Sequence, residues 1–169
     1  MWNGMLVGSG SEGSGSSIAL VDVALGDDKS TVAQAWLNGF ASPGGSGAPF
    51  LITVSPGVPV KPFALFVPKV RIGTRDHFEA THGPAHAGVA LGILDAVRTG
   101  VVPVDVAERA FLICSVWVDE GASTAHSDAL VANNRSATLE ALDNAGHEWP
   151  EAASFLEAPT QVRNLYYQG

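Results

Sequence analysis

The sequence has few cysteines and no long apolar run, so it lacks the features of disulfide-bonded and membrane proteins. It has one cysteine, Cys114, in 169 residues, so no disulfide can form within the chain and a reducing compartment is allowed. Cys114 lies in the apolar run 111–118, where we expect a buried, inert thiol rather than a nucleophile. No apolar stretch reaches the roughly 18 residues of a membrane-spanning helix, and the amino terminus lacks the pattern of a secretory signal. We therefore expect a cytoplasmic protein with no membrane contact.

Positive charge is also scarce. Nine Lys and Arg residues oppose seventeen Asp and Glu residues, which gives a formal net charge of −8. A surface this acidic repels nucleic acid and anionic lipid unless it carries a basic patch. Four of the nine cations, Lys61, Lys69, Arg71 and Arg75, fall within fifteen positions. Four cations are too few for a nucleic-acid track, so we expect a small anionic ligand and no nucleic-acid partner.

Signatures of covalent and nucleotide chemistry are missing as well. There is no G-x-S-x-G motif, and no Walker-type lysine follows the glycines at 44–47. Gly8, Gly10 and Gly13 satisfy G-x-G-x-x-G, but a β-branched run follows them where a dinucleotide-binding fold needs a helix. Covalent catalysis and dinucleotide binding are therefore disfavoured, and we expect no tightly bound cofactor.

The length and the apolar content fit one domain with a full core. Apolar residues make up 46% of the chain and charged residues 15%. We assign the domain to residues 1–160. The remaining residues, 161–169, are treated as a tail because NLYYQG resembles a variant of a protease-cleavage tag.

Apolar periodicity and turn residues predict elements in the order β-β-α-β-β-α-β-α. Helices are expected over 30–41 with Trp36 in the core, from Gly83-Pro84 to Gly100, and over 123–145. Strands are expected over 5–7, over 18–25, from residue 50, through the basic segment and over 111–118, with the Gly/Ser-rich residues 8–17 as a mobile loop. This order is typical of an α/β (α+β) two-layer fold with helices packed on one face of a mixed sheet.

The basic segment 56–72, PGVPVKPFALFVPKVRI, is the most distinctive stretch of the chain. Its prolines disfavour helix, so an extended conformation is predicted. In a strand, alternate side chains share a face, which places Lys69 and Arg71 on the same side about 7 Å apart. Such a pair suits an anionic ligand, and a solvated strand end beside a buried face would explain it equally well.

Asp22 interrupts the apolar strand IALVDVAL. It shares a face with Leu20 and Ala24, so we expect a carboxylate set into an apolar stripe. A buried carboxylate must be paired, hydrogen-bonded or protonated, and such positions are enriched at functional sites. A structural partner would also account for it.

Two of the five histidines flank the Gly83-Pro84 step. His82 and His86 have the spacing of a helical metal pair, but the proline places His82 before the helix, and no carboxylate or thiolate cluster completes a metal site. His86, on the first helical turn, is expected to act as a neutral proton shuttle, to make a capping contact, or only to pack. The other histidines are expected at the surface: His77, His126 and His147.

The basic segment, GPAH at 83–86, DVALG at 22–26, GVVP at 100–103 and NRSAT at 134–138 together resemble the formaldehyde-activating enzyme family. The resemblance covers roughly residues 5–145. It implies a compact α/β protein similar to a ribosomal-protein domain, assembled as a homopentamer. It also implies a carbon-nitrogen lyase that binds tetrahydromethanopterin between subunits as a co-substrate and condenses it with formaldehyde, giving the methylene derivative and water.

Carried over by position, the resemblance implies pterin contacts at Asp22, Leu51 and Lys69, which have the residue types of the family. Two further contacts depart from the family: Arg71 stands in place of threonine and His86 in place of glutamine. Because Arg71 adds a permanent charge with bidentate capacity, we expect a more anionic partner than the family's usual one.

The largest departure is Leu20, which stands in place of the family's catalytic histidine. Leucine neither donates nor accepts a proton, so the general-acid step needs another carrier. We expect altered chemistry in which His86 replaces the lost acid beside Asp22. The alternative is a non-catalytic binding protein for a reduced pterin or another small anion, whereas a purely structural oligomer would leave the basic segment unexplained.

Overall fold

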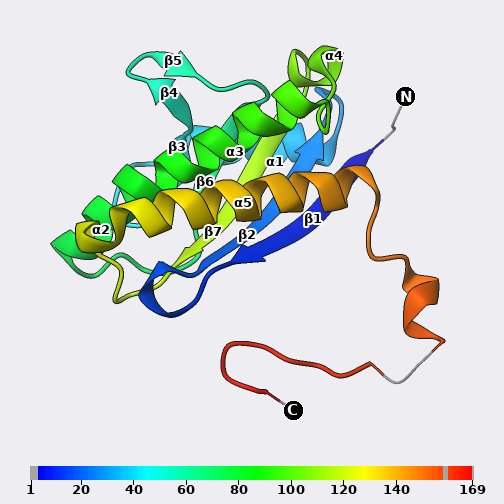
Figure 1. Cartoon of the computed structure of the whole chain (residues 1–169). Helices are drawn as coiled ribbons and strands as arrows, with labels where there is room; N and C mark the ends of the chain where they lie inside the picture. Colours follow the sequence, from blue (N-terminus) through cyan, green and yellow to red (C-terminus); the bar gives the residue numbers. More distant parts are fainter. Residues whose placement is uncertain (1–3, 158–159, 169) are drawn as a thin grey trace.

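A five-stranded mixed sheet forms the centre of the protein (Figure 1). The structure is a computed structural model and describes residues 4–157 and 160–168. The strand order is β1-β2-β7-β6-β3; β6 runs parallel to β7, and the other neighbours are antiparallel. The strands are β1 (Met5–Glu12), β2 (Ala19–Gly26), β3 (Phe50–Leu51), β6 (Phe63–Pro68) and β7 (Phe111–Val118). A separate hairpin, β4 (Thr53–Ser55) and β5 (Val58–Pro59), projects beyond the edge strand β3.

Two long helices, α3 (His86–Thr99) and α5 (Ser127–Gly146), lie side by side across one face of the sheet (Figure 1). Alternate strand residues turn toward them and are buried, including Val21, Leu112 and Cys114. Cys114 is fully buried, which confirms its packing role, and this burial raises the pKa of its thiol. The predicted mixed sheet with an α+β arrangement is therefore confirmed.

A third helix, α1 (Thr31–Phe40), corrects the expectation that the helices share one face. Trp36 of α1 packs edge-on against Phe111, at 5.2 Å between ring centroids, and against Phe63 at 6.5 Å. Both phenylalanines alternate with the strand residues that face α3 and α5, so α1 covers the opposite face at one end. The predicted core role of Trp36 is confirmed by its 6% exposure.

The Gly/Ser-rich stretch was expected to be a mobile loop, and this expectation is wrong for its first half. Residues 8–12 continue β1 and pair with β2 in antiparallel register. Gly8 and Gly10 face α5, where a Cβ would overlap the carbonyl oxygens of Ala141 and Ala137. The two glycines are therefore required because the strand packs close to the helix, and not because they make the chain flexible.

The helix that was expected to open at Gly83-Pro84 begins earlier. It runs without a break from α2 (Arg75–Ala80) through a π-helical turn (Thr81–Ala85) into α3. Thr74 caps its start by accepting the His77 N–H at 3.1 Å. Proline is tolerated because the wider turn relieves its clash with the preceding carbonyls. The predicted end is confirmed, since Gly100 adopts φ of 82°.

Two expectations about histidines are also corrected. His82 lies inside the π-helical turn and not before the helix. His77, expected at the surface, is only 2% exposed, and its Nε2 lies 3.0 Å from the Val118 carbonyl oxygen. Within residues 4–157 and 160–168, no group of three potential metal ligands comes together and no helix is long and apolar enough to cross a membrane.

The remaining elements are short. They are α4 (Val104–Ala107) and three 3-10 turns at Gly15–Ser17, Thr124–His126 and Ala152–Phe155. The residues from 160 to 168 form an extended segment that ends in a turn, in which Asn164 and Tyr167 exchange backbone hydrogen bonds.

Candidate functional site

The face of the sheet that α1 leaves partly open carries most of the sequence-predicted site residues. Strand register places Ser9, Asp22, Ser115 and Val67 in one row across four strands. The next row contains Ser11, Leu20 and Trp117. Side chains at alternate positions share a face, so the two rows form one continuous surface. We call this surface the open face.

Asp22 is exposed on the open face, although its apolar neighbours in the sequence predicted burial. Its Oδ1 accepts a hydrogen bond from Ser9 Oγ at 2.6 Å. The expectation of burial is wrong for the single chain because α1 covers the other end of this face and small residues flank Asp22 in its row. The carboxylate therefore remains available to a ligand.

Lys69 follows the last residue of β6 and stays beside β7. Its backbone N–H donates to the Val116 carbonyl at 2.9 Å, which places it next to Trp117. Lys69 and Asp22 are separated by β7, so their backbones are about 10 Å apart across the sheet plus one two-residue step along it. Both side chains are exposed, and neither forms an ion pair with another residue in the described part of the chain.

Of the two other predicted contacts near this face, Leu51 lies on the sheet and Arg71 lies beyond it. Leu51 is half-buried in β3 and pairs with Leu65, which lies in the row next to Val67. Arg71 is exposed but lies three residues beyond the end of β6, so the strand alternation that related it to Lys69 no longer applies. The structure thus brings Asp22, Leu51 and Lys69 to one face and leaves the orientation of Arg71 independent of the sheet.

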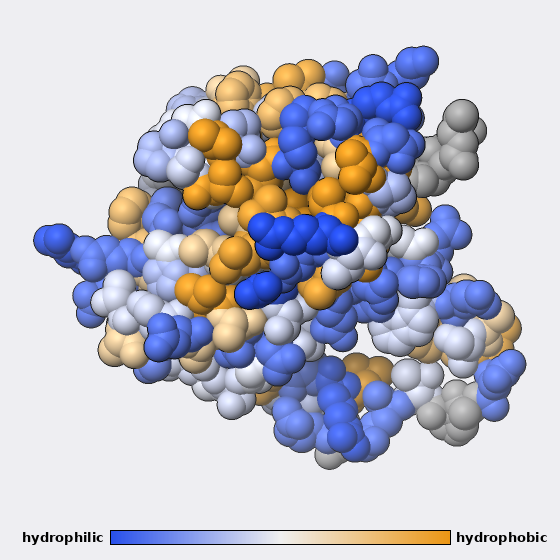
Figure 2. Space-filling view, turned by 45° about the horizontal axis from the view of Figure 1, so that its top comes forward, coloured by the Kyte–Doolittle hydropathy of each residue, from blue (hydrophilic) through white to orange (hydrophobic). Residues whose placement is uncertain are grey.

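His86 lies on the other side of the sheet from Asp22. Its ring contacts Phe50, which stacks on Phe66 at 4.8 Å, and Phe66 points to the α3 and α5 face. His86 lines a groove of about 460 Å³ between α3 and the β4–β5 hairpin, together with Val54, Leu91 and Leu94. Figure 2 shows apolar side chains gathered on this side of the molecule, between charged ones. Within one chain, His86 is not brought together with Asp22 and Lys69.

The environment of His86 favours the neutral imidazole. Its Nε2 accepts the N–H of Thr53 at 3.1 Å, so the ring proton resides on Nδ1. Burial, and second the nearby His82, lower the pKa of His86 below its ordinary value. His86 is therefore a neutral residue that holds β4 to the start of α3.

A lowered His86 pKa makes stability depend on pH. Below about pH 6.5 the unfolded chain binds a proton that the folded chain still excludes, so the free energy of unfolding falls as pH decreases from 7.5 to 5.5. We expect His86→Gln to show a smaller fall over this range in denaturant titrations, because glutamine does not titrate. The control is His147→Gln, which removes an exposed histidine. An equal fall in wild type and His86→Gln would contradict this account.

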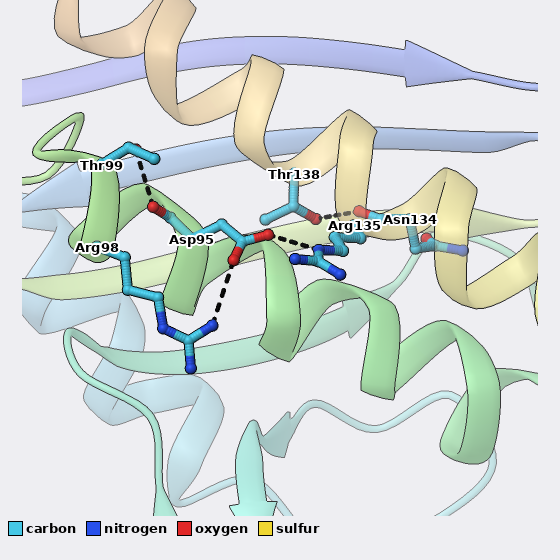
Figure 3. A network of polar contacts seen from close by, with 6 residues as sticks. All are labelled: Asp95, Arg98, Thr99, Asn134, Arg135 and Thr138. Carbon is cyan, nitrogen blue, oxygen red and sulfur yellow. Dashed lines mark hydrogen bonds and ion pairs between the residues drawn. The ribbon is translucent and has the colours of Figure 1, made fainter.

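A charged network ties the two long helices together (Figure 3). Asp95 of α3 pairs with Arg135 of α5 and, at 3.4 Å, with Arg98. The hydrogen bond from Arg135 is the main cause that lowers the pKa of Asp95. Nearby, Thr138 donates to the Asn134 carbonyl at 2.7 Å. The NRSAT segment therefore contributes to helix packing and does not reach the open face.

Trp117 and the carboxyl-terminal segment were not predicted as site residues. A cavity of about 790 Å³ is lined by Leu20 and Trp117 on the sheet and by Asn164 and Leu165 of that segment. The sequence alone does show that Trp117 shares a strand face with Ser115, because side chains alternate over residues 111–118. The register that sets Trp117 opposite Leu20 is visible only in the structure.

Fold and site together define the class: an α+β protein whose open sheet face presents a carboxylate and a lysine beside an apolar cavity, as in a small-molecule site. The sequence matches the formaldehyde-activating enzyme (Fae) family over residues 7–167, and the chain belongs to this family. The match includes the turn from Asn164 to Tyr167.

Individual relatives agree with the family assignment. A "Bifunctional enzyme Fae/Hps" of Methanosarcina mazei is 32% identical over 151 residues, which cover 89% of this chain and 38% of that protein. A "5,6,7,8-tetrahydromethanopterin hydro-lyase" of Methanosarcina barkeri is 34% identical over 114 residues, covering 68% of this chain and 64% of that protein. The chain thus spans well under half the length of the bifunctional relatives it matches.

Proposed function

We propose that the protein condenses formaldehyde with a reduced pterin such as tetrahydromethanopterin, acting as a carbon-nitrogen hydro-lyase. The observation that carries this proposal is the placement of Asp22 and Lys69 on the open face, in a chain that belongs to the formaldehyde-activating enzyme family. A relative is named for the hydro-lyase reaction on tetrahydromethanopterin. We further propose that the protein works in the cytoplasm.

The reaction needs little beyond orientation and charge. One pterin nitrogen adds to the formaldehyde carbon to give a carbinolamine, which takes up a proton at its hydroxyl group and loses water to leave an iminium cation. The second nitrogen then closes the methylene bridge and releases a proton. Asp22 is placed to stabilise the cationic intermediate, and Lys69 to hold an acidic group of the pterin. Holding both reactants close together in the reactive orientation accelerates a reaction that also proceeds without a catalyst.

Leu20 changes how water leaves the carbinolamine. It faces the cavity between Ser11 and Trp117 and supplies no proton. His86 is the candidate replacement, but it lies across the sheet from Asp22 in the same chain. We therefore propose a homopentamer in which the cleft between two subunits combines the open face of one with His86 of the other. Because His86 is neutral, it would donate a hydrogen bond from Nδ1 to the departing hydroxyl group, and the proton that completes the water would come from solvent.

A second function is favoured by the same residue. With Leu20 in the acid position, a protein that binds a reduced pterin without converting it would keep Asp22 and Lys69 and lose the proton donor. The two functions share a ligand and differ in the rate of product formation.

Lys69→Met tests the proposed site. We expect wild type to form methylene-tetrahydromethanopterin faster than the uncatalysed reaction, and Lys69→Met to weaken pterin binding roughly tenfold or more, because a charge-assisted hydrogen bond is lost. The measurements are product formation by absorbance and pterin affinity by calorimetry. Lys29→Met, in the exposed turn between β2 and α1, changes the net charge equally and should bind as wild type does. Equal affinity in wild type and Lys69→Met would contradict the site.

A further inference from the structure

Trp117 carries a hydrogen-bond donor that the chain itself does not use. Its Nε1 has no access to water and no acceptor among residues 4–157 and 160–168. Buried N–H groups nearly always find a partner, so an unpaired one in a native fold calls for an explanation. Its position beside a cavity suggests that the partner is a ligand.

Trp117 also lies next to Leu20, the residue at which this chain departs most from the family's pattern. It is the direct cross-strand partner of Leu20, and the two residues line the same cavity. Directly opposed side chains in antiparallel strands have Cβ atoms about 5 Å apart, so one small group can contact both. This part of the cavity therefore has apolar surface from Leu20 and Ile18 and the indole of Trp117, whose unpaired Nε1 is shielded in this structure.

We propose that the indole N–H of Trp117 donates a hydrogen bond to the bound pterin and makes Trp117 a specificity-determining residue, an inference that rests on the proposed function. The acceptor it selects is a carbonyl oxygen or an unprotonated ring nitrogen at the edge of a flat heterocycle. A ligand without such an acceptor leaves the donor unpaired and is disfavoured, because a desolvated donor without a partner is costly.

The carboxyl-terminal segment forms the opposite wall of this subsite. Of the lining residues, Arg163, Asn164, Leu165, Tyr166 and Gln168 belong to neither the sheet nor the β1–β2 loop. The segment is shaped by its own turn, in which Asn164 Oδ1 accepts the Tyr166 N–H at 2.9 Å. Because Nε1 is shielded in this structure, the proposed hydrogen bond requires a movement that uncovers it.

A second tryptophan provides a matched control. Trp36 Nε1 is also buried without an acceptor among the described residues, but Trp36 lies on the sheet-facing side of α1, in T-shaped contact with Phe111. Trp36 does not line the cavity, so a ligand there does not contact it. The same substitution at the two positions removes the same donor, once at the subsite and once in the core.

The test measures tetrahydromethanopterin binding without formaldehyde for wild type, Trp117→Phe and Trp36→Phe. We expect Trp117→Phe to weaken binding about five- to tenfold and Trp36→Phe to change it less than twofold. Thermal melts establish that both variants are folded. If Trp117→Phe fails to fold, the wild-type protein with nitrogen-15 in its four indoles still gives the answer. On pterin addition, the Trp117 indole signal should shift downfield while the signals of Trp36 and the exposed Trp149 stay in place.

The outcomes separate the two levels of the proposal. Pterin binding with an unchanged Trp117 signal, or with equal affinity in Trp117→Phe, overturns the role of Trp117 and leaves the proposed function standing. Absence of binding to wild type overturns the proposed function, and the role of Trp117 falls with it.

Discussion

Replacing Leu20 with histidine is expected to raise the rate of methylene-tetrahydromethanopterin formation by about 100-fold or more, the usual contribution of a positioned general acid. Leu20 lies on the open face two residues from Asp22, at the wall of the cavity. A histidine there would titrate near neutral pH and reach a carbinolamine held beside Asp22. The measurement is the initial rate at fixed formaldehyde and pterin concentrations.

The matched control is Leu37→His, which adds a histidine on the exposed side of α1 and should leave the rate unchanged. A gain confined to Leu20→His would mean that the pocket is otherwise intact and that the natural chain has lost only its proton donor. No gain, in a variant that still binds pterin, would contradict the placement of the reacting atoms next to Leu20. No gain together with no pterin binding would point to a different ligand.

Replacing Gly10 with alanine is expected to destabilise the fold by roughly 3 kcal/mol or more, in the range of severe overpacking. A Cβ at this position would overlap the carbonyl oxygen of Ala137 and lie 2.8 Å from the backbone nitrogen of Ala141. Backbone atoms of α5 cannot rotate away as a side chain does, so β1 or α5 must shift. The measurement is the free energy of unfolding in urea.

Gly44→Ala is the control for this substitution, because an added Cβ there meets no atom within 4 Å. We expect it to change stability by less than about 0.5 kcal/mol. A similar loss in both variants would show that glycine flexibility, and not the strand-to-helix approach, sets the requirement at position 10.

Local periodicity predicted the elements well where one pattern dominated. The helix over 30–41, the buried role of Trp36 and the helix end at Gly100 are confirmed by α1 and α3, and the helix expected over 123–145 is found as α5, which begins at Ser127 after a 3-10 turn. Two predictions fail for one reason, because each treats glycine or proline as a break in secondary structure. Gly8 and Gly10 continue a strand because α5 packs closely against it, and Pro84 continues a helix because a π-helical turn accommodates it. The close packing of α5 is a tertiary contact and the π-helical turn is a rare backbone conformation, so neither can be recognised from the local sequence.

The candidate site was predictable only in part, because some of its features depend on tertiary structure. Strand alternation relates Asp22 to Leu20 within one strand, but only the family resemblance brought Asp22 and Lys69 to one site, because the register between their strands cannot be read from the sequence. The exposure of Asp22 depends on where α1 ends its cover of the sheet, and the separation of His86 depends on which face α3 occupies. Trp117 was missed because its significance arises from strand register and from an unpaired N–H. The match of the family over residues 7–167 likewise extends to a tail whose sequence alone suggested a tag.

The most direct test of the account is a crystal structure of the protein with tetrahydromethanopterin. We expect the reduced pterin on the open face, with its ring nitrogens near Asp22 and an acidic group at Lys69 of the same subunit. A pterin bound instead in the groove beside His86, with Asp22 and Lys69 of every subunit out of contact, would contradict the account.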